Sequence, residues 1–187
     1  MDIFALSAAE LEALKLSLRV ALWCVAFSLP AGILVAWVLA RLDFPGCALL
    51  DGIVHLPLVL PPVVVGYGLL LVLGQQGPVG SWLYDTFGIT VAFTWKGAVV
   101  ASAIMGFPLM VRAIRLSIEA VDPGLEAAAR TLGAGPFNTF MTITLPLAWP
   151  GILTGMVLAF ARSLGEFGAT ITFVSNIPGE TRTLPLA

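Results

Sequence analysis

Residues Glu126 to Pro146 read EAAARTLGAGPFNTFMTITLP and lie between two long apolar stretches of the chain. Because stretches of that length cross a bilayer, this segment is expected to form a loop on one membrane face. Its residues predict an ordered loop, in which Asp122 caps a short helix that begins at Pro123 and Gly133 ends it. Gly135-Pro136 then turns the chain into a second short piece. So ordered a loop in a hydrophobic protein indicates a docking surface for another protein.

The same segment contains a family pattern. Its residues resemble the EAA loop of type I ABC importer permeases, and the resemblance implies a coupling helix that inserts into a cleft on a separate ATPase subunit. An ordinary helical hairpin loop is the alternative. Arg130 lies four residues after Glu126, so the two side chains are expected to form a helical ion pair. The residues assigned to the coupling loop are Glu126, Ala127, Ala128, Arg130, Gly133, Ile143, Leu145 and Pro146.

The composition excludes an ordinary soluble domain. Hydrophobic residues make up 59% of the chain, charged residues only 11%, and the mean hydropathy is +1.00, which is typical of a membrane protein. A net charge of −2 does not favour nucleic-acid binding. Cys24 and Cys47 fall within or beside the apolar stretches without the spacing of metal ligands, so they are expected to be packing residues.

The apolar stretches predict an all-α, polytopic membrane helical bundle that forms a single transmembrane domain. Between the second and third stretches, Trp82, Tyr84 and Phe87 indicate a piece that lies in the membrane interface. The expected spans cover about residues 14–40, 48–73, 93–118 and 143–161, with the coupling loop at about 122–142 and a partial segment at 163–187.

The second span contains Pro57, Pro61 and Pro62, and each proline removes a backbone donor. This helix must therefore kink or break. The carbonyl groups freed by a break are tolerated in a membrane where protein or a water-filled cavity satisfies them, so the segment is placed along the translocation path. A kinked helix that only packs against its neighbours is the alternative.

Basic residues predict the orientation. If four spans are crossed in order, the turn at Arg41 and the region from Arg112 to Arg130 share one side, which the positive-inside rule makes cytoplasmic. Lys15, Lys96 and Arg182 fall on the other side and weaken the bias. Both chain ends are then expected to face outside.

Arg162 and Glu166 lie four residues apart at the boundary of the last apolar stretch, where ionisable groups are costly. Two interpretations remain open. The pair is an intrahelical ion pair that neutralises itself, or Arg162 lies along the pore and lowers the barrier for a passing oxyanion.

The sequence contains few residues that could act as catalytic groups. The lysines, Lys15 and Lys96, do not lie in a P-loop, and His55 is the sole histidine. We therefore expect no enzymatic activity, no cofactor and no metal site, and we interpret His55 as an interfacial residue.

The resemblance extends beyond the loop, to LDGIVHLPLVLPPVVVGYGLL, GFPLMVRAIRLSIEAVD and FARSLGEFGATITFVSNIPGETRTLP. These stretches are similar to permeases of the molybdate, tungstate and sulfate branch, and among those anions they favour molybdate. The resemblance implies a homodimer in the lipid of a bacterial inner membrane, two ATPase subunits and a periplasmic molybdate-binding protein. Members usually continue into a further helix, which we expect to be missing after Ala187. A sulfate, thiosulfate or tungstate permease and a stand-alone anion channel are the alternatives.

Overall fold

The computed structural model describes residues 8–177 and 180–186, and these residues form helices, turns and loops without a strand. Pro178 and Gly179, which belong to a stretch that carries the family resemblance, lie outside the described residues. The helices are α1 (Ala8–Arg41), α2 (Cys47–Val59), α3 (Pro62–Leu73), α4 (Pro78–Phe87), α5 (Trp95–Glu119), α6 (Pro123–Thr131), α7 (Pro136–Thr139), a π-helical turn η1 (Phe140–Thr144), α8 (Leu145–Leu147), α9 (Trp149–Leu164), α10 (Gly168–Val174) and a 3-10 turn η2 (Leu184–Leu186).

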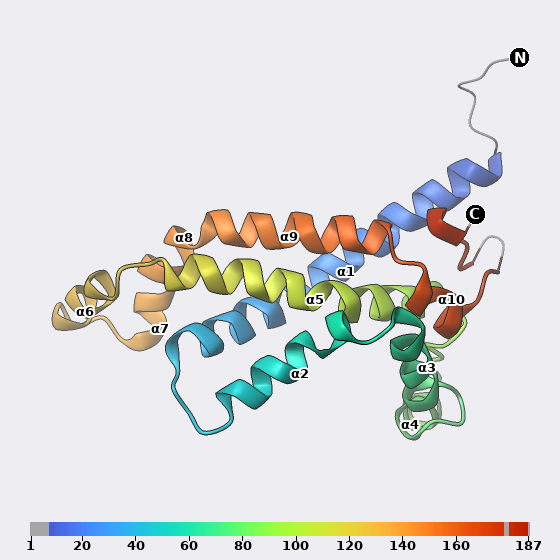
Figure 1. Cartoon of the computed structure of the whole chain (residues 1–187), viewed down its shortest axis with the longest axis horizontal. Helices are drawn as coiled ribbons and strands as arrows, with labels where there is room; N and C mark the ends of the chain where they lie inside the picture. The colour runs from blue at the N-terminus through green and yellow to red at the C-terminus, as the bar shows by residue number, and fades with distance from the viewer. Residues whose placement is uncertain (1–7, 178–179, 187) are drawn as a thin grey trace, which may run out of the picture.

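Three helices form the body of the bundle. α1, α5 and α9 pack against one another along the long axis of the molecule (Figure 1). α5 is the central one, because 61% of its most apolar stretch is buried, against 33% for α1. Its side chains join two apolar clusters, one around Met110 and Ile114 with α1 and α9, and one around Met105 with α1 and α10.

The second expected span is broken, as its prolines predict. α2 ends with Leu60 in extended conformation, Pro61 caps the next helix, and Pro62 is its first residue. The two helices are bent by 113°, so they run in different directions, and only together are they long and apolar enough for one broken crossing. α3 then packs against α4 and α10 at one end of the bundle (Figure 1).

The segment of the fourth expected span, about residues 143–161, is also bent. Residues Pro136–Leu147 form one rod from α7, η1 and α8, and this rod is bent by 69° from α9. α9 covers Trp149–Leu164, with Pro150 in its first turn and Pro146 in the rod before the bend, and the rod and α9 together are long and apolar enough for one bent crossing. The bend lies between these two prolines, where a regular helix lacks backbone donors.

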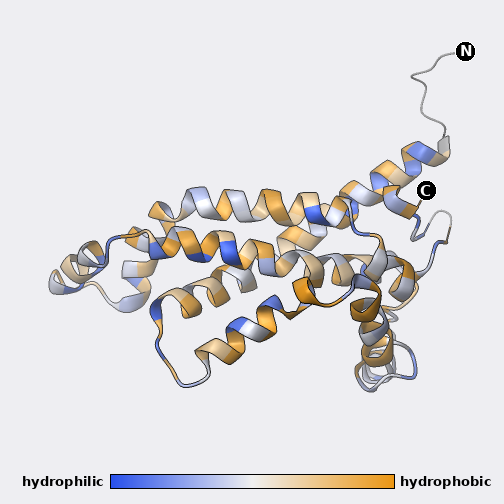
Figure 2. Cartoon of the chain, viewed as in Figure 1, coloured by the Kyte–Doolittle hydropathy of each residue, from blue (hydrophilic) through white to orange (hydrophobic). Residues whose placement is uncertain are grey.

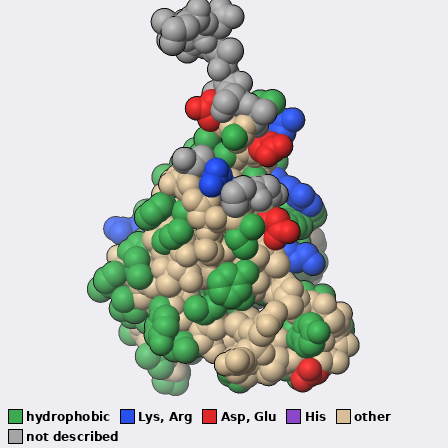
Figure 3. Space-filling model, turned by 90° about the vertical axis from the view of Figure 1, so that its right-hand side faces the viewer, with side chains coloured by type: hydrophobic (Ala, Val, Ile, Leu, Met, Phe, Trp, Pro, Cys, Tyr) green, Lys and Arg blue, Asp and Glu red, His purple; other side chains and the backbone are tan. Residues whose placement is uncertain are grey.

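The two ends of the bundle differ. α6 and α7 lie at one end, and the start of α1 and η2 lie at the other (Figure 1). Figure 3 views the end with the termini, where charged side chains of both signs gather near the N-terminal helix and hydrophobic side chains cover the flank. Arg19 there lies 4.0 Å from the centre of the Trp95 ring, a cation–π contact.

The surface of the bundle suits a lipid environment. Hydrophobic colouring dominates the helices, and the strongest hydrophilic colouring lies mainly in loops and near helix ends (Figure 2). Large apolar side chains point outward from the long helices, among them Leu22 at 62% and Phe27 at 69% exposure. α1 and α5 are each long and apolar enough to cross a membrane, and the two bent helix pairs raise the number of possible crossings to four.

Candidate functional site

The loop around α6 has the local structure that its sequence predicts. Asp122 caps the helix by accepting a hydrogen bond of 2.8 Å from the backbone N–H of Gly124, and Pro123 is the first helical residue. Gly133 follows the helix with a φ of +89°, a left-handed conformation that favours glycine. The N–H groups of Gly133 and Ala134 bond to the carbonyls of Arg130 and Ala129, which completes a Schellman motif.

Glu126 does not pair with Arg130. Its carboxylate is buried and lies 3.1 Å from the guanidinium of Arg41 at the end of α1. The hydroxyl of Thr144, in η1, donates a hydrogen bond of 2.7 Å to the same oxygen atom. Arg41 also donates to the carbonyl oxygen of Val121 at 3.0 Å. The expected helical ion pair is therefore corrected: Glu126 joins α6 to α1 and to η1.

The remaining loop residues divide between surface and interior. Ala127 and Ala128 are exposed, and so is Arg130, whose side chain makes no hydrogen bond or ion pair within the described residues. Ile143 and Leu145 are half-buried, and Leu145 packs against the core that α5 organises. The loop thus presents small alanine side chains and the large apolar side chain of Leu132, 89% exposed, outward, while its far end is anchored in the bundle.

The proline break lies directly against the start of α10. A methyl group at Gly168 would lie 2.7 Å from Cβ of Pro62, and one at Gly66 would lie 2.5 Å from the carbonyl oxygen of Ala169. The two discontinuities in the chain, after α2 and after α9, are therefore packed together. Val59, at the end of α2, is 82% exposed, so one side of the break faces outward. Pro57 lies within α2, before the break.

Arg162 and Glu166 form an ion pair, with Nη1 and Oε2 2.6 Å apart. The pair is not intrahelical, because α9 ends at Leu164. The side chain of Glu166 is 1% exposed, and its Oε1 accepts a hydrogen bond of 2.8 Å from the N–H of Ala169 in α10. Arg162 keeps 27% of its side chain exposed. Glu166 thus holds the junction of α9 and α10, while Arg162 retains an open side.

A charged cluster between α2 and α5 was not predicted from the sequence. Arg115 contacts Asp51 at 3.0 Å and Glu119 at 2.7 Å, and His55 lies 3.3 Å from the Asp51 carboxylate. Arg112 lines the same recess, is exposed, and makes no ion pair in the part of the chain that the structure describes. The i, i+4 spacing of Arg115 and Glu119 could have predicted their ion pair, whereas the contact between Arg115 and Asp51 depends on the fold.

Cys24 is buried, Cys47 is half-buried and both are free thiols. Among the described residues, no group of three or more His, Cys, Asp or Glu side chains could hold a metal ion.

Comparisons with known proteins agree with this geometry. Residues 28–187 match the family described as binding-protein-dependent transport system inner membrane component. The molybdenum transport system permease protein ModB of Escherichia coli (strain K12) is 68% identical over 178 residues, which cover 95% of this chain and 78% of that protein. ModB of Haemophilus influenzae is 61% identical over the same shares of the two chains.

Two further comparisons place the fold and the branch. The probable sulfate transport system permease protein cysT of Nephroselmis olivacea is 42% identical over 83% of this chain and 54% of that protein. A solved amino acid ABC transporter aligns with a TM-score of 0.58 at 20% identity, over 90% of this chain and 75% of that chain, which supports the fold alone. The resemblance of the chain to ABC importer permeases is thereby confirmed, and the chain belongs to the family of binding-protein-dependent transport system inner membrane components, as a multi-pass permease subunit.

Proposed function

We propose that this chain is the translocating subunit of a molybdate importer in a bacterial inner membrane. The single observation that carries the proposal is the 68% identity to E. coli ModB over 95% of the chain. The lower identity of 42% to a sulfate permease favours molybdate over sulfate as cargo. The sequence has no P-loop lysine, so ATP hydrolysis takes place in separate subunits.

The α6 loop couples this subunit to an ATPase. Its exposed face carries the small side chains of Ala127 and Ala128, which allow close approach of a partner surface. The buried contact of Glu126 with Arg41 ties the loop to the end of a membrane-crossing helix. A displacement of α6 by the partner is therefore passed to α1. A homodimer of this chain presents two such loops to two ATPase subunits.

The opposite end receives cargo from a periplasmic binding protein. Basic and acidic side chains alternate there in two recesses, which contain Lys15, Arg19 and Lys96 together with Glu12 and Glu180. Mixed charge at an exposed rim favours the encounter and orientation of a partner more than its tight binding. This distribution fits a binding protein that docks, delivers the anion and departs.

The path between the two ends passes the packed breaks at Pro62 and Gly168. Arg162 lies beside them with an open side and supplies one cation per protomer to a passing dianion. Glu166, at 2.6 Å, partly neutralises this cation, so the anion is attracted without being trapped. Movement of α3 against α10 opens or closes this part of the path.

The proposal is tested with membrane vesicles that contain the permease, its ATPase and its binding protein. ATP-dependent uptake of labelled molybdate is expected, with stronger competition from unlabelled molybdate than from sulfate or thiosulfate. Competition by unlabelled tungstate is measured in the same way, and competition stronger than that of molybdate would identify a tungstate permease. Uptake that proceeds without ATP and without an ATPase partner would instead identify a stand-alone anion channel. Stronger competition by sulfate would assign the permease to the sulfate branch.

A further inference from the structure

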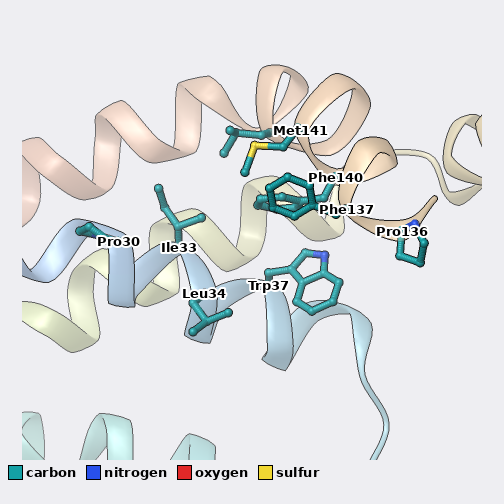
Figure 4. A pocket seen from close by; sticks show the side chains of 9 residues that line it. Pro30, Ile33, Leu34, Trp37, Pro136, Phe137, Phe140 and Met141 are labelled. Atoms are coloured by element: carbon teal, nitrogen blue, oxygen red, sulfur yellow. The ribbon is translucent and has the colours of Figure 1, made fainter. Parts of the chain in front are cut away.

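An apolar groove of about 470 Å³ lies between α1 and the rod that leads into α9. Figure 4 shows its walls: Ile33, Leu34 and Trp37 face Phe137, Phe140 and Met141. Neither wall is closed, because Leu34 is 61% exposed and Phe137 is 73% exposed. The groove runs beside α1, a helix long and apolar enough to cross a membrane.

The groove continues into a polar pocket of about 260 Å³ at the end of α1. Trp37, Pro136 and Phe140 line both spaces, so the two are contiguous. Arg41, Arg130 and Glu126 are among the residues that line the polar pocket. An apolar space thus leads directly to a cationic one, with an indole ring at the boundary, which is where tryptophan is enriched in membrane proteins.

The two arginines differ in their availability. Arg41 is held by Glu126 and by the carbonyl of Val121. Arg130 is exposed, and its side chain makes no ion pair or hydrogen bond with any described residue. The pocket therefore offers one arginine whose charge is not compensated, next to a neutral Arg41–Glu126 pair. A ligand that matches both spaces has an apolar chain and an anionic head.

We propose that this groove binds an anionic phospholipid, with an acyl chain between α1 and the rod and the phosphate beside Arg130. A helix of a partner protein would fill the apolar part of the site, but an apolar helix face would not supply a negative charge for the unpaired side chain of Arg130. A free inorganic anion would pair with the charge of Arg130 but leave the apolar groove empty. The inference concerns the permease alone and does not depend on the nature of its cargo.

Native mass spectrometry of the purified permease tests the proposal, with titration of phosphatidylglycerol or phosphatidylcholine into the delipidated protein. Arg130→Gln is expected to weaken phosphatidylglycerol retention about fivefold, because one basic side chain contributes about that factor at an anionic lipid surface. Leu34→Trp fills the apolar groove and is expected to reduce retention of the same lipid. Phosphatidylcholine binds the unmodified protein more weakly than phosphatidylglycerol.

Two matched controls keep the test specific. Arg112→Gln removes another exposed, unpaired arginine at a recess outside the groove, and Leu22→Trp enlarges a side chain on α1 that is 62% exposed. Both are expected to retain phosphatidylglycerol as the unmodified protein does. Equal loss in either control, no loss in Leu34→Trp, or equal retention of both lipids would overturn the proposal. Because transport is not measured, failure here leaves the proposed import function intact.

Discussion

The carboxylate of Glu126 is bonded to Arg41, which is 85 residues away in the sequence, and to Thr144, which is 18 residues away. A surface loop would be free to move relative to the helices beside it, but these contacts fix α6 to two other elements. Burial makes the arrangement demanding, because a charged group left without its partner inside a protein is strongly unfavourable.

Replacement of Glu126 by alanine should therefore destabilise the protein. Arg41 would keep its bond to Val121 but lose its charge partner, and a cost of about 3 kcal/mol is expected, near the lower end for a broken buried pair. Arg130→Ala is the control and should change stability by less than about 0.5 kcal/mol, as exposed substitutions do. Thermal unfolding of both variants in the same detergent measures the difference. Equal melting temperatures would contradict the role of Glu126.

The Arg162–Glu166 pair gives an asymmetric prediction. Glu166 is buried and also bonds to Ala169, whereas Arg162 is partly open, so Arg162→Gln should lower anion uptake while protein yield persists. Glu166→Ala should mainly lower yield, since α10 loses its link to the end of α9. Yield and uptake are measured for both single variants and the double variant. Equal loss of yield in both singles, with full recovery of yield and uptake in the double, would make the pair purely structural.

Local chemistry explains which residues could be predicted from the sequence. Asp122, Pro123 and Gly133 act on backbone groups within a few residues, so their helix-capping roles follow from their spacing. The partner of Glu126 could not be predicted in this way. Arg130 is the nearest cation in sequence, but the packing of α6 against the end of α1 brings Arg41 closer.

At the scale of elements, the prolines predict the break between α2 and α3 but not its angle. The 113° bend depends on where α3 packs, which is against α10, a segment more than 100 residues later in the chain. The apolar pattern continues from Ile143 into α9, so it does not reveal the 69° bend that lies between Pro146 and Pro150.

Close packing of α3 on α10 makes a prediction with an internal control. A methyl group at Gly66 would meet the carbonyl oxygen of Ala169 at 2.5 Å, whereas Gly68, in the same helix, has no atom within 4 Å of such a group. Gly66→Ala should therefore force the two helices apart, and Gly68→Ala should be tolerated and gain slightly in helix propensity. Limited proteolysis and thermal unfolding compare the two variants. Similar stability of both would show that α3 and α10 are not held at this distance.

At the scale of the whole molecule, the α6 loop lies at one end of the bundle, and the start of α1 and η2 lie at the other (Figure 1). The two breaks, after α2 and after α9, are packed together where α3 contacts α10, near this second end. An importer has to change access at the two ends in alternation. The break is the place where short helices meet without a continuous backbone hydrogen-bond ladder, so it is the part of the bundle best able to rearrange.

Cysteine labelling at the break tests this assignment. Val59→Cys and Val63→Cys introduce thiols at positions that are 82% and 53% exposed. In the assembled transporter, their labelling by a water-soluble maleimide should differ between the nucleotide-free and ATP-trapped states. Leu22→Cys, on the outward flank of α1, should be labelled equally in both. Unchanged labelling at Val59 and Val63 would mean that this segment only packs.

The central claim is that the α6 loop transmits the work of an ATPase to the permease, and paired substitutions at Gly133 and Gly135 test it most directly. Both positions are open in space, but Gly133 has a φ of +89° and Gly135 a φ of −67° as the cap of α7. Aspartate is strained at position 133, where φ is positive, and favourable at position 135, where it can cap α7. ATP-driven molybdate uptake and ATPase co-purification are measured for Gly133→Asp and Gly135→Asp at matched protein levels. The account predicts that Gly133→Asp inserts normally but loses uptake or the ATPase, while Gly135→Asp retains both; normal uptake and ATPase binding in Gly133→Asp would contradict it.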